Sequence, residues 1–498
     1  MRRILVCVLL SVLLALAPLA GLCESHFTMA GFDTETAGHV WDDNLFFLRM
    51  TERTDVSFTF KQYSDAEEWT RVKQEMLKGG ELPDVLFKAE LTNEETQALY
   101  DAGILIDLRP YLETNAPELS ALLAEHPEWV KDISMPDGAI AALPQINALT
   151  SNNNIWINQS WLKRLDLEMP ETAEQLTEVL RAFRDKDPNR SGGADEIPMT
   201  FTGMWDLRFL AHAFGFVGND FYLEVREDGL HCDIQEEGYR DFLAWLHQLW
   251  EENLLDHNGL ITADSSRQIT DAKATITYGV VFGPTAMNML PASAAGDYDT
   301  LVLAHDGKQV YRSLLGDVIR GTFAVTSACK DPGTLLSWVD YLYTEEGCFL
   351  AGTGRLGDEY EVTSDGRWYW VDDIQTVQQS VLKDATISEG AAIPVYMPAE
   401  YQMNFDDEST RRTVQEVKKV KDVSVLPYPL VWLTAEERKQ IGEIWPALGE
   451  YCEVGLTWFV TGEKELNDEN WEAFQKGMDE LQMENIISIW NRALERRQ

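Results

Sequence analysis

Positive charge is scarce in this chain of 498 residues: 41 Lys and Arg stand against 83 Asp and Glu, for a net charge of −42. So acidic a surface repels the phosphates of nucleic acids and anionic lipids, and we exclude nucleic-acid binding. The hydrophobic share of 45% and the charged share of 25% are those of ordinary globular proteins, which excludes wholesale disorder. The length allows two or three domains.

Long apolar runs are also lacking beyond the N-terminus. No later segment approaches the roughly 18 uninterrupted apolar residues that mark a membrane-spanning helix. The one apolar run, Ile4 to Leu19, follows two arginines and precedes two small residues. That order is typical of a secretory signal peptide, so we predict a signal peptide over residues 1–23 and an exported protein.

Cys23 leaves two ways of processing this signal. Small residues just before a cysteine are typical of bacterial lipoprotein signals, in which the cysteine receives a lipid. Leu22 stands where such signals carry Gly, Ala or Ser, and the alternative is ordinary cleavage after Cys23. We therefore expect either a cell-surface lipoprotein, held to the membrane only through a lipid on Cys23, or a periplasmic protein.

Cysteine is rare in the rest of the chain, and its spacing matches no zinc template. A helix predicted over residues 333–344 would hold Cys329 and Cys348 roughly 15–20 Å apart, too far for a disulfide. We expect buried apolar thiols at all four positions: Cys232, Cys329, Cys348 and Cys452.

Familiar catalytic motifs are missing. The sequence has no nucleophile elbow, no P-loop and no HExxH, and its eight histidines are scattered. A GxGxxG string at residues 352–357 follows a predicted helix rather than a strand, so we interpret it as a turn. We predict that the protein is not an enzyme. A glycoside hydrolase needs only two suitably spaced carboxylates and stays open as the alternative.

Strand and helix patterns alternate at the start of the chain. Strands at 57–63 and 82–87 are separated by an amphipathic helix at 66–78, and a further helix follows at 94–102. This rhythm predicts an α/β domain with a largely parallel sheet. A polar, Asn-rich stretch at 147–158 then indicates a crossover to a second domain.

The second block is rich in helices, which we predict at residues 172–185, 235–253, 434–450 and 471–496. Thr172 with Gln175, and Thr434 with Glu437, have the spacing of capping boxes. No Pro- or Ser-rich linker separates the blocks, so we expect two packed lobes joined by several short crossovers.

The run DPNRSGGADEIP at residues 187–198 carries the clearest chemistry. Its oxygen-bearing residues at alternate positions suit calcium, which takes six to eight oxygen ligands on a curved loop. It resembles the start of an EF-hand loop, although Pro198 stands where that loop has its last Glu. The alternative is a polar surface turn.

The same loop, and its position after an amphipathic helix, resembles the calcium loop of alginate-binding-type proteins, which are sugar-binding subunits of ABC importers in extracellular solute-binding protein family 1. Four further segments are similar to that family: residues 80–85, 103–108, 321–327 with 339–347, and 458–462 with Trp471. The resemblance implies a structural Ca²⁺ with these ligands: Asp187, Asn189, Ser191, Gly193, Asp195 and Glu196.

The resemblance also implies a periplasmic-binding-protein-like α/β fold, with two lobes, hinge crossovers and a ligand cleft between them. The expected division is 24–150 plus 320–352 for the N-terminal lobe, and 151–319 plus 353–498 for the C-terminal lobe. The implied partners are an oligosaccharide and ABC transporter permease subunits, with the protein itself a monomer. A non-transport glycan-binding or sensory protein is a further alternative.

Sugar recognition uses aromatic faces and fixed polar groups. Core packing is the commoner role of an aromatic, so we expect only a few candidates to contact ligand. Those in predicted loops or near the crossovers are Trp41, Trp156, Trp205, Tyr278, Trp368, Trp370, Tyr396, Trp432, Asn152, Asn153, Asn154 and Arg320. A uronic-acid oligomer would require clustered Arg or Lys, which the sequence does not reveal.

Overall fold

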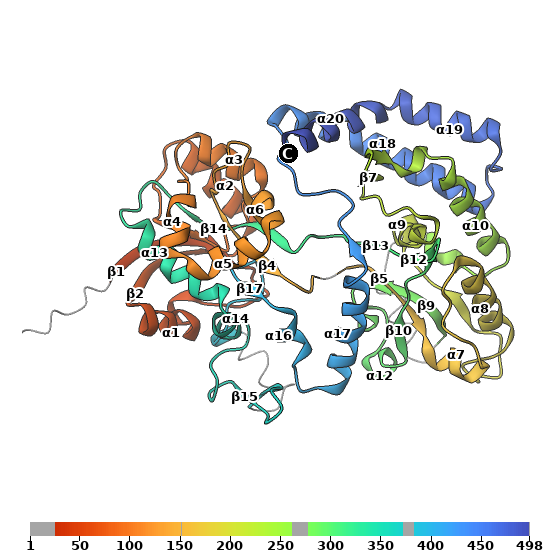
Figure 1. Cartoon of the computed structure of the whole chain (residues 1–498), viewed down its shortest axis with the longest axis horizontal. Helices are drawn as coiled ribbons and strands as arrows, with labels where there is room; N and C mark the ends of the chain where they lie inside the picture. Colours follow the sequence, from red (N-terminus) through yellow and green to blue (C-terminus); the bar gives the residue numbers. More distant parts are fainter. Residues whose placement is uncertain (1–24, 151, 261–276, 372–382, 498) are drawn as a thin grey trace, which may run out of the picture.

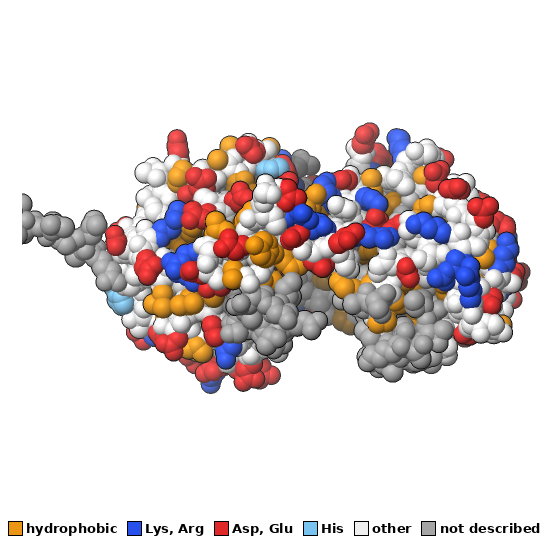
Figure 2. Space-filling view, turned by 90° about the horizontal axis from the view of Figure 1, so that it is seen from below, with side chains coloured by type: hydrophobic (Ala, Val, Ile, Leu, Met, Phe, Trp, Pro, Cys, Tyr) orange, Lys and Arg blue, Asp and Glu red, His pale blue; other side chains and the backbone are white. Residues whose placement is uncertain are grey.

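The computed structural model describes residues 25–150, 152–260, 277–371 and 383–497, which form two lobes side by side (Figure 1). Each lobe has its own β-sheet covered by helices, so the predicted two-lobed α/β fold is confirmed. Within these residues, no helix combines the length and hydropathy needed to cross a membrane. Acidic side chains are spread over both lobes on the face seen in Figure 2.

The first lobe contains a six-stranded sheet in the order β17-β4-β14-β3-β1-β2. β1 is parallel to β2 and β3, and β17 to β4, while β14 is antiparallel to both its neighbours. The strands are β1 (Ser25–Phe32), β2 (Val56–Tyr63), β3 (Val85–Phe87), β4 (Leu143–Asn147), β14 (Val318–Val325) and β17 (Tyr396–Met397). The helices are α1 (Leu45–Thr54), α2 (Ala66–Leu77), α3 (Asn93–Asp101), α4 (Arg109–Asn115), α5 (Pro117–Glu125), α6 (Pro127–Ile133), α13 (Pro332–Asp340) and α14 (Glu345–Gly352).

The second lobe contains a four-stranded sheet in the order β10-β5-β9-β6. Its strands are β5 (Asn154–Asn158), β6 (Ile197–Met199), β9 (Tyr278–Gly283) and β10 (Tyr298–Thr300). Its helices are α7 (Gln159–Leu165), α8 (Ala173–Asp185), α9 (Gly203–Leu207), α10 (Gly238–Glu251), α12 (Ala292–Ala295), α17 (Glu408–Lys421), α18 (Ala435–Thr461), α19 (Asp468–Glu480) and α20 (Met483–Arg496). The short helix α16 (Ala399–Met403) leads from the first lobe toward α17.

Among the described residues, four small two-stranded sheets lie outside these two. Three belong to the second lobe, and the hairpin of β15 and β16 projects from the first (Figure 1). They pair β7 (Leu223–Arg226) with β8 (Gly229–Cys232), β11 (Ala304–His305) with β12 (Lys308–Gln309), β13 (Tyr311–Arg312) with β18 (Ser424–Val425), and β15 (Tyr360–Val362) with β16 (Trp368–Trp370).

The helix ends show where local sequence signals were sufficient. The capping box of Thr434 and Glu437 is present at the start of α18, as predicted, but the helix continues to Thr461 through Pro446. The helix predicted over 471–496 is two helices, α19 and α20. The chain breaks at Gln482, whose φ of 70° is left-handed.

The predicted division into lobes needs one correction. Residues 353–397 were assigned to the second lobe, yet β17 pairs with β4 at the edge of the first sheet. Ile387, Ile393 and Val395 are also buried in the core of the first lobe. The chain leaves that lobe only after β17 has formed this edge. The four cysteines are buried and free, which confirms that prediction.

Candidate functional site

A cleft of about 280 Å³ opens between the lobes. Asn93 and Glu94, at the start of α3, line it from the first lobe, and Asn219, Asp220 and Arg312 line it from the second. Its remaining wall is made by crossover residues 313–316 and 318, by residues 426–431 and 433, and by Trp490 of α20. Both lobes and their connections therefore contribute to one cavity.

Arg312 is the most unusual residue in this cleft. Its side chain is only 4% exposed and forms an ion pair with Asp220 through Nη2. The guanidinium lies 4.9 Å from the ring centroid of Phe209. Its Nε and Nη1 are buried and have no hydrogen-bond partner. Burial and the neighbouring charge of Arg208 lower the pKa of Arg312, against the carboxylate of Asp220. These two free donors suit acceptor oxygens of a ligand.

Asp220 ties Arg312 to an exposed aromatic ring. The indole Nε1 of Trp205 donates to Asp220 Oδ1 at 3.1 Å, and the Trp205 side chain remains exposed. Burial acts to raise the pKa of Asp220, but the charge and hydrogen bond of Arg312, the charge of Arg208 and the hydrogen bond from Trp205 together outweigh it, so this pKa is lowered and the carboxylate stays ionised. Asp220 Oδ1 therefore joins the indole of Trp205 to the guanidinium of Arg312.

A recess of about 210 Å³ adjoins the cleft at Asp220 and is lined by Trp205, Arg208, Tyr222 and Trp445, among others. The guanidinium of Arg208 lies 3.7 Å from the ring centroid of Tyr222. Its Nη2 donates to the carbonyl of Asn219 at 2.5 Å, which supports the turn that carries Asp220.

The predicted asparagines act beneath the cleft rather than in it. Asn152 Nδ2 donates to the carbonyl of Arg312 at 2.8 Å, and its Oδ1 accepts from Leu314 N at 3.1 Å. Asn153 Nδ2 donates to Asp206 Oδ1 at 2.9 Å, and Asn154 Nδ2 to the carbonyl of Pro284 at 3.0 Å. All three are buried: Asn152 holds the crossover backbone at residues 312–314, while Asn153 and Asn154 bind other parts of the second lobe.

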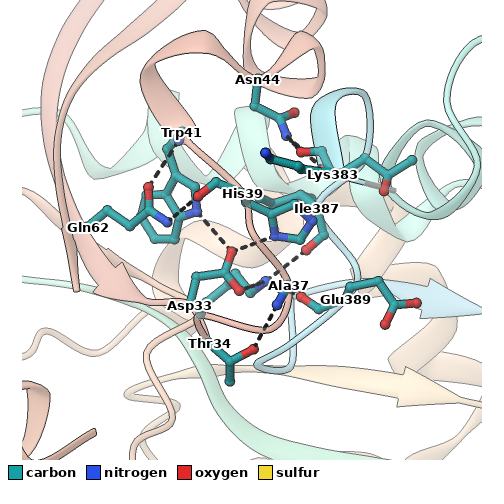
Figure 3. Close-up of polar contacts among 12 residues, drawn as sticks. Asp33, Thr34, Ala37, His39, Trp41, Asn44, Gln62, Lys383, Ile387 and Glu389 are labelled. Atoms are coloured by element: carbon teal, nitrogen blue, oxygen red, sulfur yellow. Dashed lines mark hydrogen bonds and ion pairs between the residues drawn. The ribbon is translucent and has the colours of Figure 1, made fainter. Parts of the chain in front are cut away.

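Three predicted aromatics lie in the cores, and we do not retain them as ligand contacts: Trp41, Trp156 and Tyr278. Trp41 donates its Nε1 to Asp33 in a buried polar cluster of the first lobe (Figure 3). Trp156 donates to the carbonyl of Gly283 at 2.9 Å. Their ring faces pack against other core residues and cannot stack on a sugar.

Trp368 and Trp370 are also not retained. They pack with Tyr360 inside the hairpin of β15 and β16, where only small fractions of the rings are exposed. Tyr396 lies on β17 and lines a separate hollow beside α5. The sequence analysis selected these rings because they are close to turns. Closeness to a turn does not distinguish a ring packed inside a hairpin from one that lines a cleft.

Trp432 and Arg320 do come together between the lobes. The Arg320 guanidinium lies 4.7 Å from the ring centroid of Trp432, and Trp432 Nε1 donates to the carbonyl of Ser134 at 2.7 Å. Arg320 Nη1 donates to Val431 O at 3.1 Å and to Asn93 Oδ1 at 3.3 Å. Arg320 thus ties the first lobe to the segment that crosses it.

The sequence analysis missed Asp220, Arg312 and Trp490 in the cleft, and Arg208 and Trp445 in the recess beside it. Trp445 and Trp490 occupy helical positions that read as core, and no motif surrounds Arg312. The large number of aromatic residues was a usable signal for a sugar site. Their positions in the sequence did not show which of them line the cleft.

The predicted calcium loop follows α8 and is closed by its own side chains. Asn189 Nδ2 and Ser191 Oγ donate to Asp195 Oδ1 at 2.8 and 2.7 Å. Asp187, whose φ of 46° is left-handed, accepts from Gly192 N through Oδ2 at 3.2 Å. Gly193 N donates to Ser191 Oγ at 3.0 Å, and this hydrogen bond of its backbone amide fixes the position of Gly193 in the loop.

Two acceptors on this loop are unsatisfied. Asp187 Oδ1 and Glu196 Oε1 are buried and have no hydrogen-bond partner. Burial, together with the charges of Asp195 and Asp187, raises the pKa of Glu196. Within the described residues no three side chains of His, Cys, Asp or Glu converge closely enough to hold a metal ion. A cation here would also need amide, hydroxyl or backbone oxygens, and the two orphaned acceptors fit such an ion.

Two packed α/β lobes with a polar and aromatic cleft between them define a two-lobed ligand-binding protein. The family model for bacterial extracellular solute-binding proteins matches residues 47–347, more than half of the chain. The chain belongs to that family.

Individual proteins that are similar to this chain are also described as binding proteins. The chain is 25% identical, over 90% of its length and 86% of the other protein, to the fructooligosaccharide ABC transporter substrate-binding protein FusA of Streptococcus pneumoniae. Among solved structures, an HMO-binding solute-binding protein of Bifidobacterium longum infantis superposes with a TM-score of 0.78, at 18% identity, covering 95% of this chain and 99% of that one. The alginate-binding protein AlgQ2 gives 0.61 at 19% identity, covering 95% and 98%.

Proposed function

We propose that this protein captures an oligosaccharide in the interlobe cleft and delivers it to the permease of an ABC importer. The observation that carries the proposal is the cluster of Trp205, Asp220 and Arg312, in which Asp220 links an exposed indole to a guanidinium with two unpartnered donors. A sugar presents C–H faces to an aromatic ring and hydroxyl oxygens to such donors. Closure of the lobes would then surround it.

The named relatives support this function. FusA and the Bifidobacterium protein are both described as parts of ABC transport, with fructooligosaccharide and HMO as their respective ligands. They are binding proteins rather than enzymes. In this cleft, the carboxylates of Glu94 and Asp220 each pair with an arginine, Arg438 and Arg312 respectively. That pairing disfavours the glycoside hydrolase, which needs an acid able to hold a proton.

We also propose that Ca²⁺ binds the loop at residues 187–196 as a structural ion. The unpartnered, buried oxygens of Asp187 and Glu196 support it. The predicted ligands Asn189, Ser191, Gly193 and Asp195 would complete the set from the same loop. Two of the similar solved structures are described as an EF-hand mutant of FusA and as AlgQ2 without calcium ion. The ion would order the end of α8, apart from the cleft.

Export and a monomeric state remain part of the proposal. Cys23 and the predicted signal peptide lie outside the described residues, so lipid attachment and cleavage after Cys23 both stand. Mass spectrometry of the protein recovered from cells would separate them, since a lipid adds a defined mass to Cys23.

A thermal-shift panel tests the function. The purified protein is heated with fructans, milk oligosaccharides, uronate oligomers and peptides, each with and without calcium. A ligand at 100 times its Kd stabilises the folded state by about 2.7 kcal/mol. We expect one glycan class to raise the Tm and to be recovered uncleaved. A shift with peptides alone, or cleavage of any glycan, would overturn the proposal.

A further inference from the structure

A second hollow, of about 240 Å³, lies between the lobes on the other side of the crossing segment at residues 430–433. Residues 430, 431 and 433 line the main cleft, whereas Trp432 lines this crevice. Its walls are α6 with the turn after it and the end of α20. It is smaller than the roughly 300–1,000 Å³ of most ligand pockets, so it suits one part of a longer ligand.

The crevice gathers positive charge in a chain of net charge −42. Lys131, Arg496 and Arg497 line it, and Arg320 lies against the ring of Trp432. The carboxylates paired with this group are Asp132, with Arg497, and Glu437, with Arg496. No Asp or Glu is among the residues that line the crevice, and of its three lining cations Lys131 is the one without a carboxylate partner among the described residues.

Two of these cations have unused donors. Lys131 is exposed, and its side chain makes no hydrogen bond or ion pair with any described residue. Arg320 Nη2 is buried and has no partner. Burial lowers the pKa of Arg320 to about 10, which still leaves it charged at neutral pH. Arg496 is held in place by Glu437 and by the carbonyl of Trp432, at 3.1 Å from its Nη2.

We propose that this crevice is a subsite for the carboxylate of a uronic-acid residue, so that the captured oligosaccharide is an acidic one. The proposal rests on the function proposed above and names its substrate class. Trp432 offers the aromatic surface for the sugar ring, while Lys131 and Arg496 face the carboxylate, since cation–carboxylate hydrogen bonds are the stronger kind. The main cleft, lined by the adjacent residues of the same segment, holds the neighbouring sugars.

The test compares one sugar chain with and without its charge. Calorimetric titration of the whole protein with trigalacturonate and with its fully methyl-esterified form keeps ring and length constant and changes only the carboxylates. We expect the acid to bind at least tenfold more tightly, and its affinity to fall as NaCl is raised from 50 to 500 mM. Equal affinity of acid and ester would overturn the subsite.

Lys131→Gln removes one free cation without breaking a contact. We expect a rise of about five- to tenfold in the Kd of the acid and no change for the ester. The matched control is Lys476→Gln, an exposed lysine of α19, far from the first lobe (Figure 1), which should change neither. An equal effect of Lys131→Gln on acid and ester, or no effect on the acid, would contradict the proposal.

The two proposals fail separately. If neutral fructans or milk oligosaccharides bind and trigalacturonate does not, the uronate subsite is wrong and the oligosaccharide function stands. If no carbohydrate binds, both are wrong.

Discussion

Lys88 Nζ lies 2.7 Å from Asp33 Oδ1, and both side chains are completely buried. The second oxygen of Asp33 accepts from Trp41 Nε1 at 3.1 Å and lies 2.7 Å from His39 Nδ1 (Figure 3). Lys88 also donates to the carbonyls of Ile387 and Glu389, which joins the start of the chain to the segment before β17. Burial acts to raise the pKa of Asp33, but His39 and Lys88 outweigh it and lower this pKa.

Lys88→Met should destabilise the protein strongly. It leaves the buried carboxylate of Asp33 without its cation, and breaking such a pair costs roughly 3–5 kcal/mol in the free energy of unfolding. Urea denaturation of the wild type and the variant measures this loss of unfolding free energy. The control is Lys61→Met, because Lys61 pairs with Glu81 on the surface and exposed pairs contribute about 1 kcal/mol or less. Equal costs for the two variants would contradict this view of the cluster.

Asp206 should make stability depend on pH. Burial raises its pKa to about 6, against hydrogen bonds from Thr202 N and Asn153. The unfolded chain releases this proton at about pH 3.9, so between about pH 4 and 6 the folded state binds more protons and stability falls as pH rises. A difference of one between the folded and unfolded pKa values corresponds to about 1.4 kcal/mol in the free energy of unfolding.

Asp206→Asn should remove that slope. Unfolding free energies at pH 4.5 and 6.5 would differ by about 2 kcal/mol less in the variant than in the wild type. Asp241→Asn, an exposed change of the same charge on α10, controls for net charge. A slope unchanged by Asp206→Asn would show that this carboxyl does not hold a proton in the folded state.

Trp205→Ala should weaken capture of whichever glycan the panel identifies. The ring is 38% exposed beside Arg312, so its removal deletes a stacking surface and leaves the core intact. Loss of a central aromatic contact costs roughly 2 kcal/mol, or about 30-fold in Kd by calorimetry. Tyr369→Ala, equally exposed at 38% on the β15–β16 hairpin, should change neither Kd nor Tm. An unchanged Kd in Trp205→Ala would exclude this ring from the ligand wall.

Calcium should stabilise the wild type, and a chelator should lower its Tm. At calcium 100 times above its Kd the gain is about 2.7 kcal/mol. Asp187→Asn and Glu196→Gln should abolish the calcium-dependent shift, since each removes the charge at an orphaned acceptor. Asp185→Asn, on the same helix end but paired with Arg184, should retain it. A Tm independent of calcium in the wild type would refute the ion site.

Local features were predictable because their causes lie within a few residues. Thr434 caps α18 through Glu437, three residues away, and the start of the helix follows from that pair. The break between α19 and α20 at Gln482 was not predicted because the apolar pattern continues across it. The break comes from the left-handed backbone of Gln482. Which of the predicted aromatics lie in a core could not be told from the sequence for a related reason: residue type does not tell which face of a strand or turn another element will cover.

The alternating strands and helices, the buried thiols and the loop after α8 could be predicted from the sequence, since periodicity, capping and short motifs act over short distances, and the resemblance of several segments implied the family and its two-lobed fold. The residues that face the cleft follow instead from the packing of the two lobes. Arg312 and Asp220 are 92 positions apart, and they meet because Asn152, from a third segment, holds the backbone of Arg312. The crevice at Trp432 likewise combines α6 with α20, separated by most of the chain. Contacts of that range depend on the packing of whole lobes, which no local pattern records.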